Sequence, residues 1–333
     1  MPTVPFHQLA EGQESDFYVL FARKELKETK TGKPYFSITF RDAQRSVSFP
    51  VWNDSPLFVS VKEHWKQGMF FKVRGVYQNT QYGPQIEIYQ IREVNESDKE
   101  LGFNMDLFLA HSRIEPEIMF AELLDILKNS IGLNDPLYEL CEAILTENKP
   151  ELLTLSAASR NHHAFLGGWL EHTLNVVKNA VYFGIRYTEQ YPDLNPPLDM
   201  GLLSAGAALH DIGKLEEIAL SGGSFDYTVS GNLLGHMLLG RDIVRDACKR
   251  FGFQGERFTL LEHIIISHQR LPEWGAPKPP MIPEALLVHF ADDTDAKFAI
   301  ITNVRNGIPE PGQFSPTQNT MGYKIYRIGE EEE

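Results

Sequence analysis

The chain has 333 residues, of which 42% are hydrophobic and 23% charged, and these values exclude a disordered, a fibrous and a very small stapled protein. The net charge of −14 argues against a general nucleic-acid coat protein, because neutralising phosphates requires Lys and Arg. The charge is uneven: residues 13–95 carry a net +3 and the rest of the chain −17, which suggests two parts with different tasks.

The two cysteines, Cys141 and Cys248, are far apart and form no CxxC pair, so they supply neither a disulfide framework nor a thiolate zinc site. This usage fits a reducing cytoplasm. The N-terminus lacks the order of a secretion signal, and no apolar stretch approaches the roughly 20 residues that a membrane span needs. We therefore expect a cytoplasmic protein that does not enter a membrane.

Residues 13–95 predict five short strands separated by turn signals, with a helix at 55–67 between the third and the fourth. This order is typical of an OB-fold β-barrel, which often holds single-stranded nucleic acid or sugar. The strands are expected within DFYVLFARKEL, KPYFSITFRD, RSVSFPVWND, GMFFKVRGVYQN and PQIEIYQIREV. In the second strand, Phe36, Ile38 and Phe40 should fill the barrel, which leaves Tyr35 and Arg41 facing outward.

From about residue 103 to 305 the apolar spacing changes to three or four residues and predicts helices. The fold class is thus a multidomain α and β protein, an N-terminal OB-fold barrel followed by an all-α helical bundle. The expected division is an OB-fold domain at 1–98, a helical connector at 99–155, a helical domain at 156–310 and a loosely held acidic tail at 311–333.

Eight of the eleven histidines fall between residues 162 and 289. Several polar residues lie on the apolar faces or at the ends of predicted helices, and each taken alone is most simply a hydrogen-bonded core residue. Together they favour a shared metal, because an unpaired buried imidazole or carboxylate is costly. The candidate ligands are His172, His210, Asp211, His236, His268 and Asp292.

Imidazole and carboxylate without thiolate suit Mn²⁺, Fe²⁺, Mg²⁺ or Zn²⁺. Six ligands exceed what one ion with open positions would use, so we predict two adjacent ions, with the carboxylate of Asp211 as the bridge. Such a pair of ions polarises a phosphate and activates a water molecule.

The set His172, His210-Asp211 and Asp292 resembles the HD-domain superfamily of metal-dependent phosphohydrolases. The likeness extends to the YhaM-type 3′→5′ exoribonucleases, which join an N-terminal OB-fold to a C-terminal HD domain, and so covers almost the whole chain. The strings that carry it are NHHAFLGGWLEHT (161–173), LHDIGK (209–214), GNLLGHM (231–237), ISHQ (266–269) and EALLVHFADDTDAK (284–297). One departure is Ser267-His268-Gln269-Arg270, where relatives commonly read SHHG, followed by the proline-rich LPEWGAPKPP.

The resemblance implies a role for each matching position. His172, His210, Asp211 and Asp292 would bind one metal, and His236 and His268, with Asp211 bridging, the second; manganese is the first choice, with Mg²⁺, Fe²⁺, Co²⁺ or Zn²⁺ as alternatives. Lys214 would contact the scissile phosphate, and His163 would meet the substrate or the ligands. The resemblance also implies a homo-oligomer.

The sequence therefore predicts a metal-dependent 3′→5′ exoribonuclease that releases nucleoside 5′-monophosphates from single-stranded RNA, or from single-stranded DNA. The residues expected to grip the strand, the aromatic ones by stacking, are Tyr35, Arg41, Trp52, Arg74, Tyr77 and Tyr82. Each of these aromatic residues has barrel core or an oligomer contact as its alternative. Two other functions stay open: a phosphohydrolase of small or cyclic nucleotides, and a catalytically silent single-strand-binding module.

Overall fold

The computed structural model describes residues 3–29, 31–81, 83–158, 165–221 and 224–329. The chain forms two compact units, Met1–Ala110 with Leu220–Ser224, and His111–Ala219 with Phe225–Glu333.

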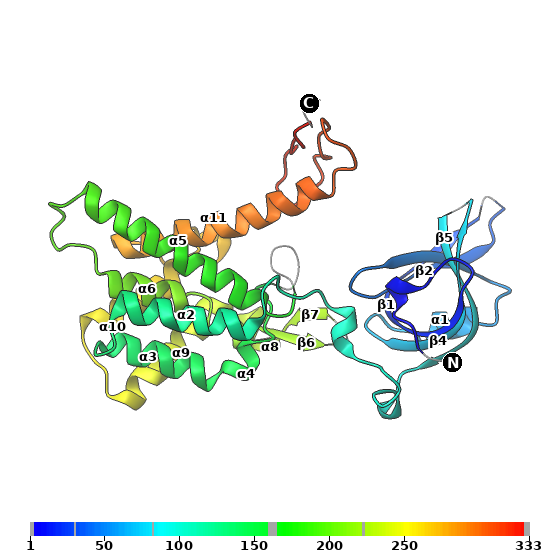
Figure 1. Ribbon diagram of the computed structural model, residues 1–333, viewed down its shortest axis with the longest axis horizontal. Helices are drawn as coiled ribbons and strands as arrows, with labels where there is room; N and C mark the ends of the chain where they lie inside the picture. The colour runs from blue at the N-terminus through cyan, green and yellow to red at the C-terminus, as the bar shows by residue number, and fades with distance from the viewer. Residues whose placement is uncertain (1–2, 30, 82, 159–164, 222–223, 330–333) are drawn as a thin grey trace. The chain divides into compact units, whose positions relative to one another are not determined.

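The N-terminal unit is a five-stranded antiparallel sheet with the order β3-β2-β1-β4-β5. The helix α1 (Phe58–Glu63) stands between β3 and β4, and the edge strands β3 and β5 contact each other, so the sheet closes into a small barrel (Figure 1). The strands are β1 (Glu14–Glu28), β2 (Pro34–Arg41), β3 (Ser46–Trp52), β4 (Phe70–Thr80) and β5 (Gly83–Glu93). This is the OB-fold topology that the sequence predicts.

The barrel follows from alternation of apolar and polar residues. Phe36, Ile38 and Phe40 of β2 are buried as predicted, while the residues between them are only partly buried. The long strand β1 pairs with β4 through its first half and with β2 through its second, and an irregularity between Phe21 and Arg23 lets it bend from one partner to the other. Three short 3-10 helices complete the unit: Phe6–Gln8, Glu96–Asp98 and Met105–Phe108.

The second unit is a helical bundle around one core. Its elements are α2 (Pro116–Ile131), α3 (Pro136–Glu147), α4 (Lys149–Leu152), α5 (Gly168–Gln190), α6 (Met200–Leu209), α7 (Lys214–Glu217), α8 (Val229–Leu234), α9 (His236–Phe251), α10 (Glu256–Ser267), a 3-10 turn (Pro272–Trp274) and α11 (Pro283–Asn306). Two short strands, β6 (Ile218–Ser221) and β7 (Ser224–Tyr227), are divided between the two units. In Figure 1, α5 and α11 run side by side across the bundle, and these two helices contact each other.

Helix α6 lies at the centre of this bundle and contacts α2, α3, α5, α10 and α11. Its small residues permit this crowding: a Cβ added at Gly206 would lie 2.7 Å from the Ile264 side chain of α10. The side chain of Asp199 caps its first turn by accepting from the Leu202 N–H at 2.9 Å. The helix ends at His210, and it therefore delivers His210 and Asp211 to the interior of the bundle.

Three features differ from the sequence expectations. The region is not wholly helical, because β6 and β7 pair as a short two-stranded sheet. Helices α2 to α4, expected in a connector at 99–155, place their apolar residues in the same core as α5 and α6. Within the expected loose tail, Ser315 and Ile325 are buried, and the Ser315 N–H donates to the Ile325 carbonyl at 2.8 Å.

Candidate metal centre

Six polar side chains from five helices or their ends meet in the interior of the helical unit, and they are the six that the sequence predicts as ligands. They form two groups, in each of which one ligand atom per residue lies within 4.8 Å of the others. The first group is His172 on α5, His210 at the end of α6, and Asp292 on α11; the second is Asp211, His236 at the start of α9, and His268 at the end of α10.

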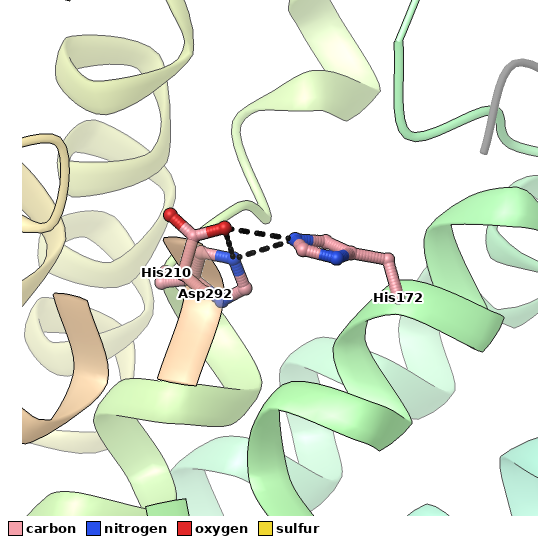
Figure 2. Close-up of side chains that lie close together, drawn as sticks. All are labelled: His172, His210 and Asp292. Atoms are coloured by element: carbon pink, nitrogen blue, oxygen red, sulfur yellow. Dashed lines mark hydrogen bonds and ion pairs between the residues drawn. The ribbon is translucent and has the colours of Figure 1, made fainter. Parts of the chain in front are cut away.

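In the first group, Nε2 of His172 lies 3.4 Å from Nε2 of His210 and 3.2 Å from Oδ1 of Asp292. Figure 2 shows the His172 ring reaching from its own helix toward the other two side chains. In the second group, Nε2 of His236 lies 3.3 Å from Nε2 of His268. In each group, two imidazole nitrogens thus face each other.

Asp211 lies between the two groups and presents one carboxylate oxygen to each. Its Oδ2 is 3.4 Å from Nε2 of His210 and 3.7 Å from Nε2 of His172. Its Oδ1 is 3.4 Å from Nε2 of His236 and 3.6 Å from Nε2 of His268. This is the placement that a carboxylate bridging two cations requires.

The opposite ring nitrogen of every histidine has a hydrogen-bond acceptor. The Nδ1 atoms of His210 and His268 lie 2.8 and 2.7 Å from the carbonyl oxygens of Ala207 and Ile265. The other two Nδ1 atoms face carboxylates: that of His172 is 2.7 Å from Asp295, and that of His236 is 2.9 Å from Glu217. Each ring in its neutral form therefore carries its proton on Nδ1 and turns the lone pair of Nε2 toward the centre.

The imidazole lone pairs and the carboxylate oxygens point toward the same centre, and not every one of these acceptors has a hydrogen-bond donor. Oδ1 of Asp211 is buried and has no hydrogen-bond partner among the described residues. Burying such an acceptor unpaired is unfavourable, and a cation removes the penalty. The donor set is nitrogen and oxygen without sulfur, so the residues present fit two divalent cations.

The protonation states of Asp211 and His268 agree with this interpretation. Burial would raise the pKa of Asp211, but Lys214 and His210 hold that pKa well below its usual range. Burial lowers the pKa of His268 to about 3, so this ring is neutral at pH 7. Burial would also lower the pKa of His172, but Asp292 and Asp295 raise it to about 9 in the protein without metal.

Lys214 is buried, and its ammonium group lies 2.6 Å from Oδ2 of Asp211 and donates to the carbonyl of Ala157 at 2.5 Å. Burial would lower the pKa of Lys214, but Asp211 outweighs this effect and raises it, so the side chain stays charged. This charge lies beside the predicted bridge. His163 lies outside the described residues.

The structure brings two of the predicted strand-gripping residues together on the barrel. Tyr35 of β2 and Trp52 of β3 are register partners, their ring centroids are 5.0 Å apart, and Trp52 is half-exposed. Lys27 of β1 is the other register partner of Tyr35, so a cation and two aromatic rings form one row across the sheet.

The other predicted strand-gripping residues are engaged inside the unit. Arg41 donates to the carbonyl of Phe108 at 2.8 Å, and burial lowers its pKa. Arg74 forms ion pairs with Glu14 and Asp16, at 3.4 and 3.6 Å. The ring of Tyr77 lies 4.4 Å from the Arg45 guanidinium, and its hydroxyl donates to Asn79. Tyr82 lies outside the described residues.

Three residues that support the centre were not predicted. Asp295 and Glu217 accept from the ligand histidines, and Glu217 also accepts from the main-chain N–H of His236 at 2.9 Å. The indole N–H of Trp169 donates to the main-chain carbonyl of Asp211 at 2.9 Å. Their spacing in the sequence could have indicated them, because Asp295 and Glu217 lie one helical turn after Asp292 and Lys214.

Residues 169–297 match the protein-family model described as the HD domain, and this range contains all six candidate ligands. The helical unit therefore carries an HD domain. With both ligand groups in place, this domain has the site of a metal-dependent phosphohydrolase, and it follows an OB-fold unit.

Two solved structures were found similar to a part of this chain. One is a domain of replication protein A from Methanococcus maripaludis, with 19% identity, covering 28% of this chain and 98% of that one, at a TM-score of 0.22. The other is the second OB-fold domain of replication protein A from the same organism, with 16% identity, coverages of 28% and 96%, and a TM-score of 0.21. Among the described residues, no helix has the length and apolar character to cross a membrane.

Proposed function

We propose that this protein is a metal-dependent 3′→5′ exoribonuclease that hydrolyses single-stranded RNA to nucleoside 5′-monophosphates. The observation that carries the hydrolytic part is Asp211, whose two carboxylate oxygens face the two ligand groups. Two divalent cations bound there would supply Lewis-acid chemistry for phosphodiester hydrolysis.

The residues of the chain have separate tasks in this proposal. His172, His210 and Asp292 hold one cation, and His236 and His268 hold the other, with Asp211 shared. Lys214 places a positive charge at the edge of the centre, where it attracts the anionic phosphate. Glu217 and Asp295 orient two of the rings.

The barrel supports a single-stranded polymer as the substrate. The row of Lys27, Tyr35 and Trp52 offers two neighbouring rings, tilted by 43° to each other, beside a cation, a combination that grips unpaired bases and phosphates without sequence preference. The preference for RNA and the 3′→5′ direction rest on the sequence strings that resemble YhaM-type enzymes.

The test uses single-stranded RNA labelled at either end and incubated with the full chain and Mn²⁺. We expect a 3′ label to appear at once in mononucleotides and a 5′ label to remain in a ladder of shortened products. Asp211→Ala should reduce the rate by roughly a hundred-fold or more, because several kcal/mol of transition-state stabilisation depend on the centre. Full residual activity of this variant would remove the dinuclear assignment.

The same assay separates the other functions. Faster hydrolysis of a mononucleotide or a cyclic dinucleotide than of the oligomer would favour a small-nucleotide phosphohydrolase. Binding of the oligomer without metal and without any turnover would indicate a silent binding module. Release of the 5′ label first would reverse the proposed direction.

A further inference from the structure

A cleft of about 490 Å³ in the helical unit adjoins the second ligand group. Its lining includes Lys214 and His236 of the metal centre and two aromatic residues, Tyr227 at the end of β7 and Trp274 in the proline-rich loop. The two aromatic side chains are 50% and 49% exposed, so their surfaces are available to a ligand. The candidate metal ligands alone assign no role to this cleft or to its two aromatic residues.

The main chain and one neighbouring cation hold Trp274 in position. It ends the 3-10 turn Pro272–Trp274, where its N–H donates to the Leu271 carbonyl at 3.0 Å. The following Gly275 has a φ of 91°, which ends the turn, and its N–H donates to the Pro272 carbonyl. The Lys297 ammonium lies 5.5 Å from the centroid of the Trp274 ring. The main chain therefore fixes the position of residue 274, while its indole stays half-exposed.

We propose that this cleft binds the terminal nucleotide of the substrate, with the base against Trp274 and Tyr227 and the phosphate beside Lys214 and His236. The inference rests on the proposed function and names the subsite that it needs. The volume lies within the range of pockets that hold small molecules. Every base has a flat π-face that an indole or a phenol ring can stack on, so this subsite accepts any of the four bases.

The first test varies enzyme and substrate together. Two oligoribonucleotides are compared that differ only in the 3′-terminal residue, which carries a base in one and lacks it in the other. We expect Trp274→Ala to raise KM for the complete oligomer about ten-fold, since stacking contributes about 1 to 3 kcal/mol per base. KM for the oligomer without the terminal base should stay unchanged.

Two further variants control this comparison. Trp274→Phe retains a ring and should recover most of the wild-type KM for the complete oligomer. Val229→Ala removes an exposed apolar side chain of α8 that does not line the cleft, and it should leave KM unchanged for both substrates. An equal rise of KM for both oligomers in Trp274→Ala, or no rise for either, would overturn the assignment.

A second readout does not depend on turnover. Trp65 and Trp169 are buried, so in a Trp52→Phe chain the exposed indole that remains is Trp274. With Mn²⁺ present, adenosine 5′-monophosphate should change its fluorescence saturably, whereas ribose 5-phosphate, which has no base, should not. The change should disappear when Trp274→Phe is added, and the bound metal, measured by mass spectrometry, should stay the same.

The two readouts separate the two proposals. If no oligonucleotide is cleaved but adenosine monophosphate still reports on Trp274, the exonuclease proposal is wrong and the nucleotide cleft stands. If RNA is cleaved while the nucleotide leaves the fluorescence of Trp274 unchanged, the exonuclease proposal stands and this cleft is not the base subsite.

Discussion

Asp295 lies 2.7 Å from Nδ1 of His172, and it stands one helical turn after Asp292, whose Oδ1 is 3.2 Å from Nε2 of the same ring. Helix α11 therefore both supplies a ligand and orients a ligand from α5. A carboxylate in this place fixes the tautomer of an imidazole and increases its basicity toward a metal.

We expect Asp295→Asn to weaken metal binding about 10- to 100-fold, because an amide orients the ring with a weaker hydrogen bond and no charge. Titration of metal-free protein with Mn²⁺, followed by calorimetry, measures this change. The matched control is Asp293→Asn on the same helix, which removes only an ion pair with Lys297 at 3.3 Å. Equal affinities in the two variants would show that Asp295 does not orient His172.

Metal binding should stabilise the helical unit, because cations neutralise a cluster of converging acceptors. At a Mn²⁺ concentration a hundred times the dissociation constant, we expect about 2.7 kcal/mol of stabilisation and a rise in Tm of about 5 to 10 °C. Asp211→Asn should remove most of this shift, since both groups lose their shared ligand. Differential scanning calorimetry with and without chelator provides the comparison, and a full shift in the variant would contradict the bridging role.

Single-strand binding should depend on the aromatic row of the barrel. Trp52→Ala is expected to weaken binding of a fluorescent single-stranded RNA about ten-fold, through the loss of a stacking surface. Fluorescence anisotropy of the full chain in the presence of chelator measures binding without hydrolysis. Tyr89→Ala, which removes a similarly exposed ring from β5, should leave the affinity unchanged. Equal losses in both variants would argue against a specific row.

The barrel should lose stability in acid through Asp98. This buried carboxylate accepts two hydrogen bonds from Arg92, both at 2.6 Å, one from the Asn95 N–H and one from the Tyr18 hydroxyl. The bonds from Arg92 outweigh the opposing effect of burial and hold the pKa of Asp98 below its usual range. Because the folded pKa is the lower one, the stabilisation is complete above the unfolded pKa of about 3.9 and is lost as the pH falls through the folded value.

Asp98→Asn should therefore destabilise the barrel by about 1 to 2 kcal/mol at pH 7, because it removes the charge-assisted hydrogen bonds from Arg92, whose half-exposed side chain keeps part of its hydration. The difference from the wild type should shrink as the pH is lowered below about 4. Hydrogen exchange of peptides from β4 and β5, recorded across this range, gives both quantities. A difference that does not depend on pH would contradict the role of the ionised carboxylate.

Arg270 has a φ of 66°, a left-handed conformation that favours glycine. This conformation costs a residue with a side chain about 1 kcal/mol. A glycine variant avoids that cost, but the greater freedom of its unfolded chain offsets part of the gain in stability. We expect Arg270→Gly to be as stable as the wild type or up to about 1 kcal/mol more stable, and Arg270→Val to be less stable by about 1 kcal/mol. Thermal unfolding ranks the three proteins, and a valine variant at least as stable as the glycine variant would contradict the strain.

The sequence predicted the elements and the six polar residues that converge better than it predicted the partners of those residues. Strict alternation in β2 determined which side of the strand is buried, and helical spacing placed the polar ligands on inward faces. Such periodicity indicates the direction in which a side chain points, but it does not identify the group that the side chain contacts. It therefore did not distinguish Asp295, which holds a ring, from Asp293, which pairs with an exposed lysine.

The same limit explains the basic residues of the barrel. Alternation places Arg41 outward, but it contains no information about the segment at 104–108 that supplies the carbonyl to which Arg41 donates. Arg74 likewise has its acidic partners on β1, in a register that only the folded sheet defines. Long-range pairing of this kind depends on tertiary structure.

The indole of Trp169 anchors the backbone of Asp211, and the carboxylate of Asp211 reaches both ligand groups. One rotamer of Asp211 thus places a carboxylate oxygen in each group, so a substitution that turns this side chain alters both groups at once. In evolutionary terms, both groups depend on the codon for residue 211. Under the proposed function, a change of Asp211 would remove the shared ligand of both cations and with it the hydrolysis of phosphodiesters.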